Sequence, residues 1–147
     1  MKDSEFKALN HLIGHGNVIA TRGQQVADGY KPDATVINAA GSIVYILESE
    51  QKTDRKAFLG DVLKAEYLSD RQNITPELII VMRIFKNTTV NQIADHIRPY
   101  KLWLAEKNGG ALNLSGIHVL SDSEYIQSIE SGESLGSEEF KVRGTIV

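Results

Sequence analysis

Apolar residues recur at the three-and-four spacing of an amphipathic helix in four stretches of the chain. Gly14 ends the first stretch, because glycine is favoured directly after a helix. Pro99 is expected to split or kink the third, because proline cannot donate a backbone hydrogen bond inside a helix. The predicted helices cover residues 3–13, 53–69, 90–104 and 122–129.

Runs of β-branched and other apolar residues predict strands between these helices. The segment Asn38-Ala39-Ala40-Gly41 separates two such runs and has the length and composition of a hairpin loop. A nearly continuous apolar run at 78–84 is typical of a strand covered on both faces. The predicted strands are 17–20, 34–37, 42–47, 78–84 and 116–120, with an edge strand over 140–146 and loops over 21–31 and 131–139.

The order of these elements predicts an α/β fold. We expect a mixed β-sheet of about 4–5 strands, flanked by helices on both faces. At this length the chain forms one domain, which we assign to residues 1–130. Residues 131–147 are expected to be an acidic, flexible segment that ends in the edge strand.

Composition and charge narrow the class of protein. A hydrophobic fraction of 41% is enough to bury a core, and the absence of cysteine excludes disulfides, thiolate-bound metals and a cysteine nucleophile. No apolar stretch is long enough for a bilayer and no signal peptide is evident, so we expect a cytoplasmic protein with no membrane partner. The net charge is −3, but residues 1–107 hold 13 acidic and 14 basic side chains, so the acidity lies mainly in the tail.

Acidic residues gather at the open end of the predicted hairpin. Asp33 precedes its first strand, and Glu48 and Glu50 follow the apolar part of its second. If a two-residue turn at 39–40 closes the hairpin, Asp33 lies opposite Ile46 and diagonal to Glu48, at roughly 7 to 8 Å. Side chains alternate between the two faces of a strand, so the three carboxylates are expected to share one face.

Three carboxylates on one face suit a hard divalent cation. Mg²⁺, with Mn²⁺ as a substitute, takes oxygen ligands and keeps water molecules for chemistry. Bound to Asp33, Glu48 and Glu50, it would lower the pKa of a water molecule and stabilise charge on a phosphodiester. Lys52 falls on the same face and supplies a nearby ammonium group. Hydrolysis is therefore the expected class of reaction.

The same residues carry a resemblance to a known family. The Pro-Asp pair at 32–33, the hairpin, and then Glu48-Ser49-Glu50 or Glu50-Gln51-Lys52 resemble the PD-(D/E)xK, or restriction endonuclease-like, nuclease superfamily. The resemblance covers about residues 3–120 and implies a core of a helix, three antiparallel strands, a helix and a strand. It implies that Asp33 and Glu48 bind Mg²⁺, and that Glu50, or Lys52 in the second register, handles the attacking water. The diagonal geometry favours the first register.

The resemblance implies that residues 1–130 form a metal-dependent endonuclease that hydrolyses DNA. Cutting both strands of a duplex needs two active sites, so we expect a homodimer or a partner subunit. Two alternatives stay open: RNA as the substrate, and a non-catalytic nucleic-acid-binding or assembly subunit with the same fold. With the three site acids set aside, residues 1–107 hold 10 acidic and 14 basic side chains, so the net charge does not exclude nucleic acid.

Several other side chains are weaker candidates. Glu5 belongs to the first helix, which in the superfamily often adds an acid to the metal site, but an exposed surface position is the favoured interpretation of this residue. His11 and His15 have the spacing of a metal-binding pair but no evident third ligand. Tyr100 and Trp103 favour a core or dimer contact over base stacking. The residues that could contact substrate phosphates are Arg55, Lys56, Lys64, Arg83, Lys86, Arg98 and Lys101.

Overall fold

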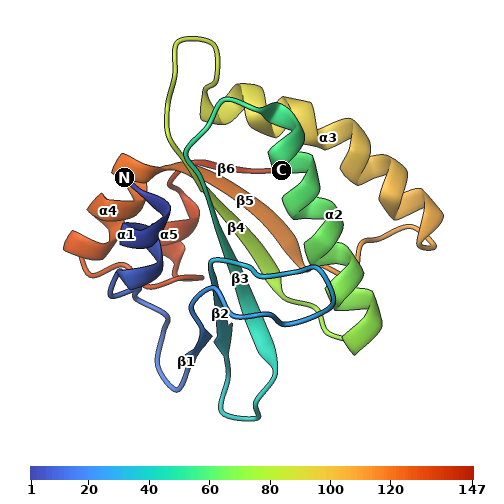
Figure 1. Cartoon of the computed structure of the whole chain (residues 1–147), viewed down its shortest axis with the longest axis horizontal. Helices are drawn as coiled ribbons and strands as arrows, with labels where there is room; N and C mark the ends of the chain where they lie inside the picture. Colours follow the sequence, from blue (N-terminus) through green and yellow to red (C-terminus); the bar gives the residue numbers. More distant parts are fainter.

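Six strands form one mixed sheet, in which neighbours in space are also neighbours in sequence, in the computed structural model of residues 1–147 (Figure 1). The first three strands pair antiparallel, the next two join in parallel, and the last is an antiparallel edge. The strands are β1 (Val18–Thr21), β2 (Ala34–Ile37), β3 (Ile43–Glu50), β4 (Glu77–Met82), β5 (Gly116–Ser121) and β6 (Thr145–Ile146).

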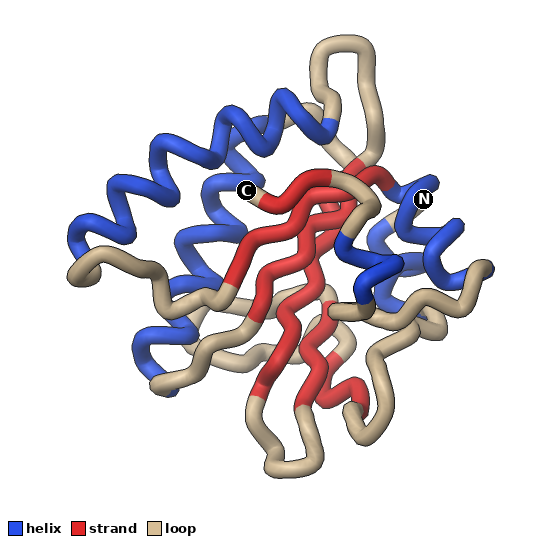
Figure 2. Tube along the Cα trace, turned by 180° about the vertical axis from the view of Figure 1, so that it is seen from behind, coloured by secondary structure: helices blue, strands red, loops and turns tan.

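Helices cover both faces of this sheet. Figures 1 and 2 show α2 and α3 on one side and α1, α4 and α5 on the other. The α/β class is confirmed, whereas the expected count of four to five strands is wrong, since the sheet has six strands. None of the helices combines the length and the apolar character that crossing a membrane requires. The helices are α1 (Asp3–Ala8), α2 (Arg55–Gln72), α3 (Val90–Lys107), α4 (Asp122–Glu130) and α5 (Glu138–Lys141).

Two apolar cores lie on either side of the central strand β4. Leu78, Ile80 and Met82 pack towards α2 and α3. Ile79 and Val81 point to the opposite face and pack towards the other three helices. The prediction of a strand covered on both faces is therefore confirmed. The strand ends at Met82, two residues before the predicted end, because a polar loop begins at Arg83.

The first helix is shorter than the predicted span of 3–13. The guanidinium group of Arg22 donates hydrogen bonds to the carbonyl oxygens of Lys7 and Leu9. The carbonyl oxygen of Leu12 accepts a hydrogen bond from the C-terminal part of the chain. Because tertiary donors satisfy these carbonyls, the backbone leaves the helix early while its apolar side chains still reach the core.

Pro99 does not split the third predicted helix, since α3 runs unbroken from Val90 to Lys107. The ring of Pro99 and the neighbouring Asp95 are both exposed. Pro99 has no N–H group to donate to the carbonyl oxygen of Asp95. That oxygen lies on the solvent side of the helix, where a water molecule can replace the lost hydrogen bond.

The C-terminal segment contributes to the core. Leu135 and Phe140 are buried among the side chains beneath α1 and α4. The predicted edge strand over 140–146 is wrong in its first part, because Phe140 belongs to α5 and only Thr145–Ile146 pairs with β5. The predicted loop over 131–139 likewise gives way to α5 at Glu138. Burial of two large apolar side chains holds this segment against the sheet.

Candidate active site

The hairpin of β2 and β3 places Asp33 directly beside Glu48. Asn38 accepts backbone hydrogen bonds from within the turn, and the loop spans residues 38–42 instead of two residues. Ile37 pairs with Ile43, and an irregularity then shifts the remaining pairs until Ala34 lies opposite Leu47. The prediction that Asp33 faces Ile46 is therefore wrong. Continued by one residue, the observed register brings Asp33 opposite Glu48.

Hydrogen bonds fix Asp33 against the second strand. Its Oδ2 atom accepts a hydrogen bond of 2.7 Å from the backbone N–H of Ser49. Its own N–H lies 3.4 Å from Oε2 of Glu48. Asp33 and Glu48 are both buried. Burial raises the pKa of Asp33, against the opposing effects of the Ser49 N–H and the Lys7 ammonium group.

Glu48 occupies the most enclosed position of the group. The hydroxyl of Tyr30 donates a 2.8 Å hydrogen bond to its Oε1 atom. Burial raises the pKa of Glu48 to about 8, with the charge of Asp33 acting in the same direction and the Tyr30 hydrogen bond in the opposite one. Tyr30 is itself buried, and burial followed by the charge of Glu48 raises its own pKa. The phenol thus stays a hydrogen-bond donor.

Asp61 on α2 is a fourth carboxyl group of this cluster, and the sequence analysis did not select it. Burial raises its pKa to about 10, and the charges of Glu48 and Glu50 add to that rise. A hydrogen bond joins the carboxyl groups of Asp61 and Glu50, which requires a proton on one of them. Oδ2 of Asp61 is buried and receives no hydrogen bond from a donor group of the protein. We call Asp33, Glu48, Glu50 and Asp61 the carboxylate cluster.

A sequence signal for Asp61 existed in the pattern of α2. Phe58, Val62 and Ala65 form the buried stripe of this helix, and Asp61 lies four residues before Ala65. An acidic residue beside a buried stripe is unusual unless it meets a partner or a ligand. From that position the side chain of Asp61 points at the C-terminal half of β3.

Helix α1 brings Lys7 and Asp3 near the cluster, while Glu5 is exposed, as the sequence analysis favoured. The carboxylate of Glu5 accepts a hydrogen bond of 2.8 Å from the N–H of Lys2, so it caps its own helix. Lys7 forms an ion pair with Asp33 at 3.4 Å. The negative charge of Asp3 contributes to the raised pKa of both Asp33 and Glu50. The only ion pair made by the carboxylate cluster is therefore the one with Lys7.

Lys52 lies beyond the end of β3 and is exposed. Its side chain makes no hydrogen bond or ion pair with the carboxylate cluster. The neighbouring Gln51 donates a 3.0 Å hydrogen bond to the hydroxyl of Ser49. Glu48 and Glu50 both belong to the carboxylate cluster. They are the two acids of the acid-x-acid register, which the sequence analysis favoured.

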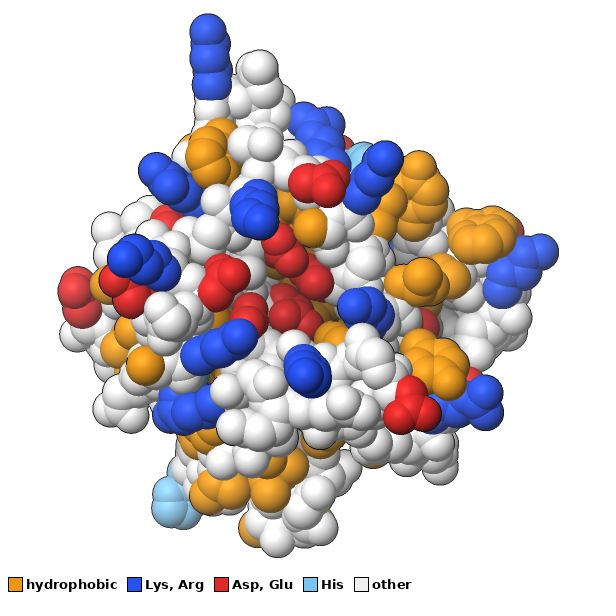
Figure 3. Space-filling view, in the orientation of Figure 1, with side chains coloured by type: hydrophobic (Ala, Val, Ile, Leu, Met, Phe, Trp, Pro, Cys, Tyr) orange, Lys and Arg blue, Asp and Glu red, His pale blue; other side chains and the backbone are white.

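A pocket of about 290 Å³ opens beside the cluster. Glu48 and Asp61 form part of its wall together with the buried Tyr30. Lys64, predicted to reach substrate phosphates, is exposed and lines the pocket, as does Lys31 from the preceding loop. Figure 3 shows acidic side chains in a hollow near the middle of this face, with Lys and Arg side chains on several sides.

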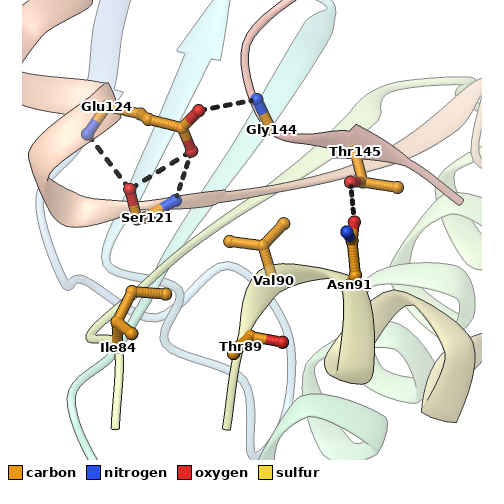
Figure 4. Close-up of a pocket in the computed structure, with 8 residues that line it drawn as sticks. All are labelled: Ile84, Thr89, Val90, Asn91, Ser121, Glu124, Gly144 and Thr145. Carbon is orange, nitrogen blue, oxygen red and sulfur yellow. Dashed lines mark hydrogen bonds between the residues drawn. The ribbon is translucent and has the colours of Figure 1, made fainter.

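A second pocket lies between the first turns of α3 and α4 and the start of β6 (Figure 4). Its volume is about 350 Å³, and Glu124 is its only ionisable side chain. Glu124 accepts hydrogen bonds from the backbone N–H groups of Ser121 and Gly144. Its carboxylate therefore anchors the C-terminal segment to the start of α4.

The weaker candidates lie elsewhere. His11 is buried and forms a 2.6 Å hydrogen bond with the hydroxyl of Tyr125, while His15 is exposed. Of the two roles expected for Tyr100 and Trp103, the one in the core is wrong, since their side chains are 46% and 55% exposed, and the dimer contact stays a prediction. They line an apolar groove between α2 and α3.

The chemistry of the carboxylate cluster fits a hard cation, although its present geometry does not enclose one. No three Asp, Glu, His or Cys side chains are arranged to hold a metal ion directly. The ligand atoms of the cluster are carboxyl oxygens whose charges raise one another's pKa, and one buried oxygen of Asp61 receives no hydrogen bond. A divalent cation would relieve both conditions. Comparisons of this chain with family models, with curated proteins and with solved structures give no match.

Proposed function

We propose that this protein is a metal-dependent nuclease that hydrolyses phosphodiester bonds of DNA at the carboxylate cluster. The observation that carries the proposal is the convergence of Asp33, Glu48, Glu50 and Asp61 from three separate elements, with Lys7 as their only ion-pair partner. Carboxyl groups buried together raise one another's pKa and cost folding energy, so such a cluster favours a role in binding or catalysis.

The order of elements supports the proposal as well. A helix, three antiparallel strands, a helix and a parallel strand follow one another as α1, β1 to β3, α2 and β4. This is the order implied by the resemblance to the restriction endonuclease-like superfamily. The C-terminal half of β3 carries Glu48 and Glu50, and the loop before β2 carries Asp33.

Each side chain has a task in the proposed reaction. Asp33, Glu48 and Glu50 would hold Mg²⁺, which when bound acidifies a water molecule and offsets charge on the phosphate. Tyr30 fixes the Glu48 carboxylate through its hydroxyl. Lys31 and Lys64 line the pocket and are placed to attract the phosphate oxygens. Glu50, which accepts a hydrogen bond from the protonated Asp61, is placed to accept a proton from the attacking water.

One observation favours a second candidate, a non-catalytic nucleic-acid-binding or assembly subunit. The carboxylate cluster has no three-ligand arrangement for a metal ion. Under this candidate the acids would be remnants, and the basic side chains around the hollow would carry the function. The two candidates differ in one measurable property, metal-dependent cleavage.

The deciding experiment is cleavage of plasmid and single-stranded DNA, and of RNA, by the whole chain in Mg²⁺, Mn²⁺ or EDTA. We expect cleavage of DNA in both metals, none in EDTA, and loss of activity in Asp33→Ala and Glu48→Ala. Glu5→Ala is the matched control, because Glu5 is an exposed acid outside the cluster. Cleavage that survives both cluster substitutions would refute the site, and no cleavage of any substrate would favour the second candidate.

DNA over RNA, the homodimer and the cytoplasmic location stay predictions. The RNA arm of the cleavage assay tests the first. Light scattering of the purified chain tests the second, with a mass of 16.2 kDa expected for a monomer and twice that value for a dimer.

A further inference from the structure

The loop between β4 and α3 starts at the candidate active site. Met82 pairs with Glu50 in the parallel β3–β4 ladder, and the N–H of Arg83 donates a 3.0 Å hydrogen bond to the carbonyl oxygen of Glu50. The chain then leaves the sheet and projects from the body of the molecule, as Figures 1 and 2 both show. We call residues 83–88 the wing.

Hydrogen bonds make the wing a narrow, defined turn. Phe85 and Thr88 exchange two backbone hydrogen bonds of 3.2 Å, which leaves Lys86 and Asn87 at the tip. From the first turn of α2, Arg55 donates a 2.8 Å hydrogen bond to the carbonyl oxygen of Asn87. The wing is therefore tied both to the strand that carries Glu50 and to the helix that carries Asp61.

The charge of the wing is entirely positive. No Asp or Glu occurs between Glu77 and Asp95. Arg83 and Lys86 are exposed, and neither they nor Arg55 takes part in any ion pair of the protein. The guanidinium group of Arg83 lies over the ring of Phe85, 5.1 Å from its centre, which holds the side chain without neutralising it. Unpaired cations on a projecting turn are suited to phosphates.

We propose that the wing binds the phosphate backbone of double-stranded DNA and positions the duplex over the carboxylate cluster. This inference rests on the proposed function, which it extends to a substrate class. A duplex presents phosphates on both sides of a groove, so one strand can reach the cluster while Arg83 and Lys86 contact the other. A single strand held in the pocket beside Glu48 would not need a second contact on a projecting turn.

The test is fluorescence anisotropy of the whole chain with a labelled DNA duplex of about 30 base pairs, roughly three helical turns, and with one of its single strands. Binding is measured in EDTA over a range of salt concentrations. We expect tighter binding of the duplex, and at least about tenfold weaker duplex binding in R83A/K86A, with a salt slope smaller by roughly two. The charge-preserving R83K/K86R is expected to bind like the wild type.

The matched control is R71A/K107A, which removes the same charge from the far ends of α2 and α3. Thermal unfolding checks that all variants fold. Equal duplex affinity in R83A/K86A and the wild type, or an equal loss in R71A/K107A, would overturn the inference while metal-dependent cleavage still stood. A larger loss of affinity for the single strand than for the duplex in R83A/K86A would also overturn it. A chain that binds duplex through the wing but never cleaves it would refute the proposed function alone.

Discussion

The hydroxyl of Tyr30 donates a hydrogen bond of 2.8 Å to the carboxylate of Glu48, and both side chains are buried. Tyr30 comes from the irregular segment before β2, and Glu48 from the long strand of the hairpin. The bond connects the loop that lines the pocket to the acid at its centre. It also favours the ionised form of Glu48, in opposition to burial.

Tyr30→Phe removes this donor and leaves the rest of the ring in place. We expect a loss of about 1 to 2 kcal/mol in the free energy of unfolding at pH 9, where Glu48 is ionised, because the buried carboxylate loses a charged hydrogen bond. The loss should be smaller at pH 6, below the Glu48 pKa of about 8. Urea unfolding at both pH values measures it. Tyr67→Phe, on an exposed ring, is the control, and an equal loss in both variants would contradict the assignment.

The pKa values of the carboxylate cluster predict how stability changes with pH. In the folded chain the pKa of Asp61 is raised to about 10 and that of Glu48 to about 8, so the native state binds more protons than the unfolded state above about pH 4. As far as these two groups are concerned, the metal-free protein is therefore most stable below about pH 4 and loses stability as the pH rises from about 4 to about 10.

Asp61→Asn tests this pH dependence, because the amide keeps the shape of the side chain and cannot ionise. We expect the stability of the variant relative to the wild type to increase by several kcal/mol between pH 5 and pH 9. Asp70→Asn, an exposed position of the same helix, should show no such increase. Parallel stability curves for wild type and Asp61→Asn would show that Asp61 does not carry this dependence.

Divalent cations should stabilise the folded chain. A ligand that binds only the native state adds about 2.7 kcal/mol at a hundredfold excess over its Kd, so millimolar Mg²⁺ should raise Tm at pH 8 by several degrees. The rise should disappear in Asp33→Ala and in Glu48→Gln. It should persist in Glu5→Gln, whose carboxylate caps α1. A rise of equal size in all variants would indicate nonspecific binding.

The two registers of the motif make opposite predictions for catalysis. Glu50 lies in the carboxylate cluster and Lys52 is exposed beyond it. We therefore expect Glu50→Gln to lower the cleavage rate by roughly a hundredfold or more, and Lys52→Ala by less than about tenfold. Single-turnover rates on plasmid DNA measure both. The reverse order would assign the reaction to the acid-x-lysine register.

Gly144 is required where the chain turns from α5 into β6. Its φ of +63° is in the left-handed region, and a Cβ atom there would meet the carbonyl oxygen of Val119 and lie 2.5 Å from Cβ of Leu120. Gly144→Ala should therefore lower the free energy of unfolding by about 2 kcal/mol or more. Gly132→Ala, at a φ of +72° with no neighbour within 4 Å, should cost only about 1 kcal/mol. Equal losses would show that the close contact relaxes.

Local patterns determined much of this fold. The apolar run around Ile80 and the two strands on either side of Asn38 lie where the sequence predicted them, because an alternating pattern and a continuous apolar run are both properties of residues adjacent in sequence. The same reasoning brought Asp33, Glu48 and Glu50 to one end of one hairpin. α2 also begins within a residue or two of its predicted start, since Asp54 caps it through its own side chain.

Tertiary structure decided what local patterns leave open. The five-residue turn at Asn38 and the irregularity beside Ile37 set the register that brings Asp33 opposite Glu48, and neither is fixed by strand propensity. Arg22 ended α1 by binding its carbonyl oxygens from a distant segment. Asp61 joined the carboxylate cluster because α2 packs across β3. The sequence by itself determined which side chains were available for chemistry, and only packing between elements far apart in the chain determined which of them are buried together, since burial depends on neighbours that no local pattern specifies.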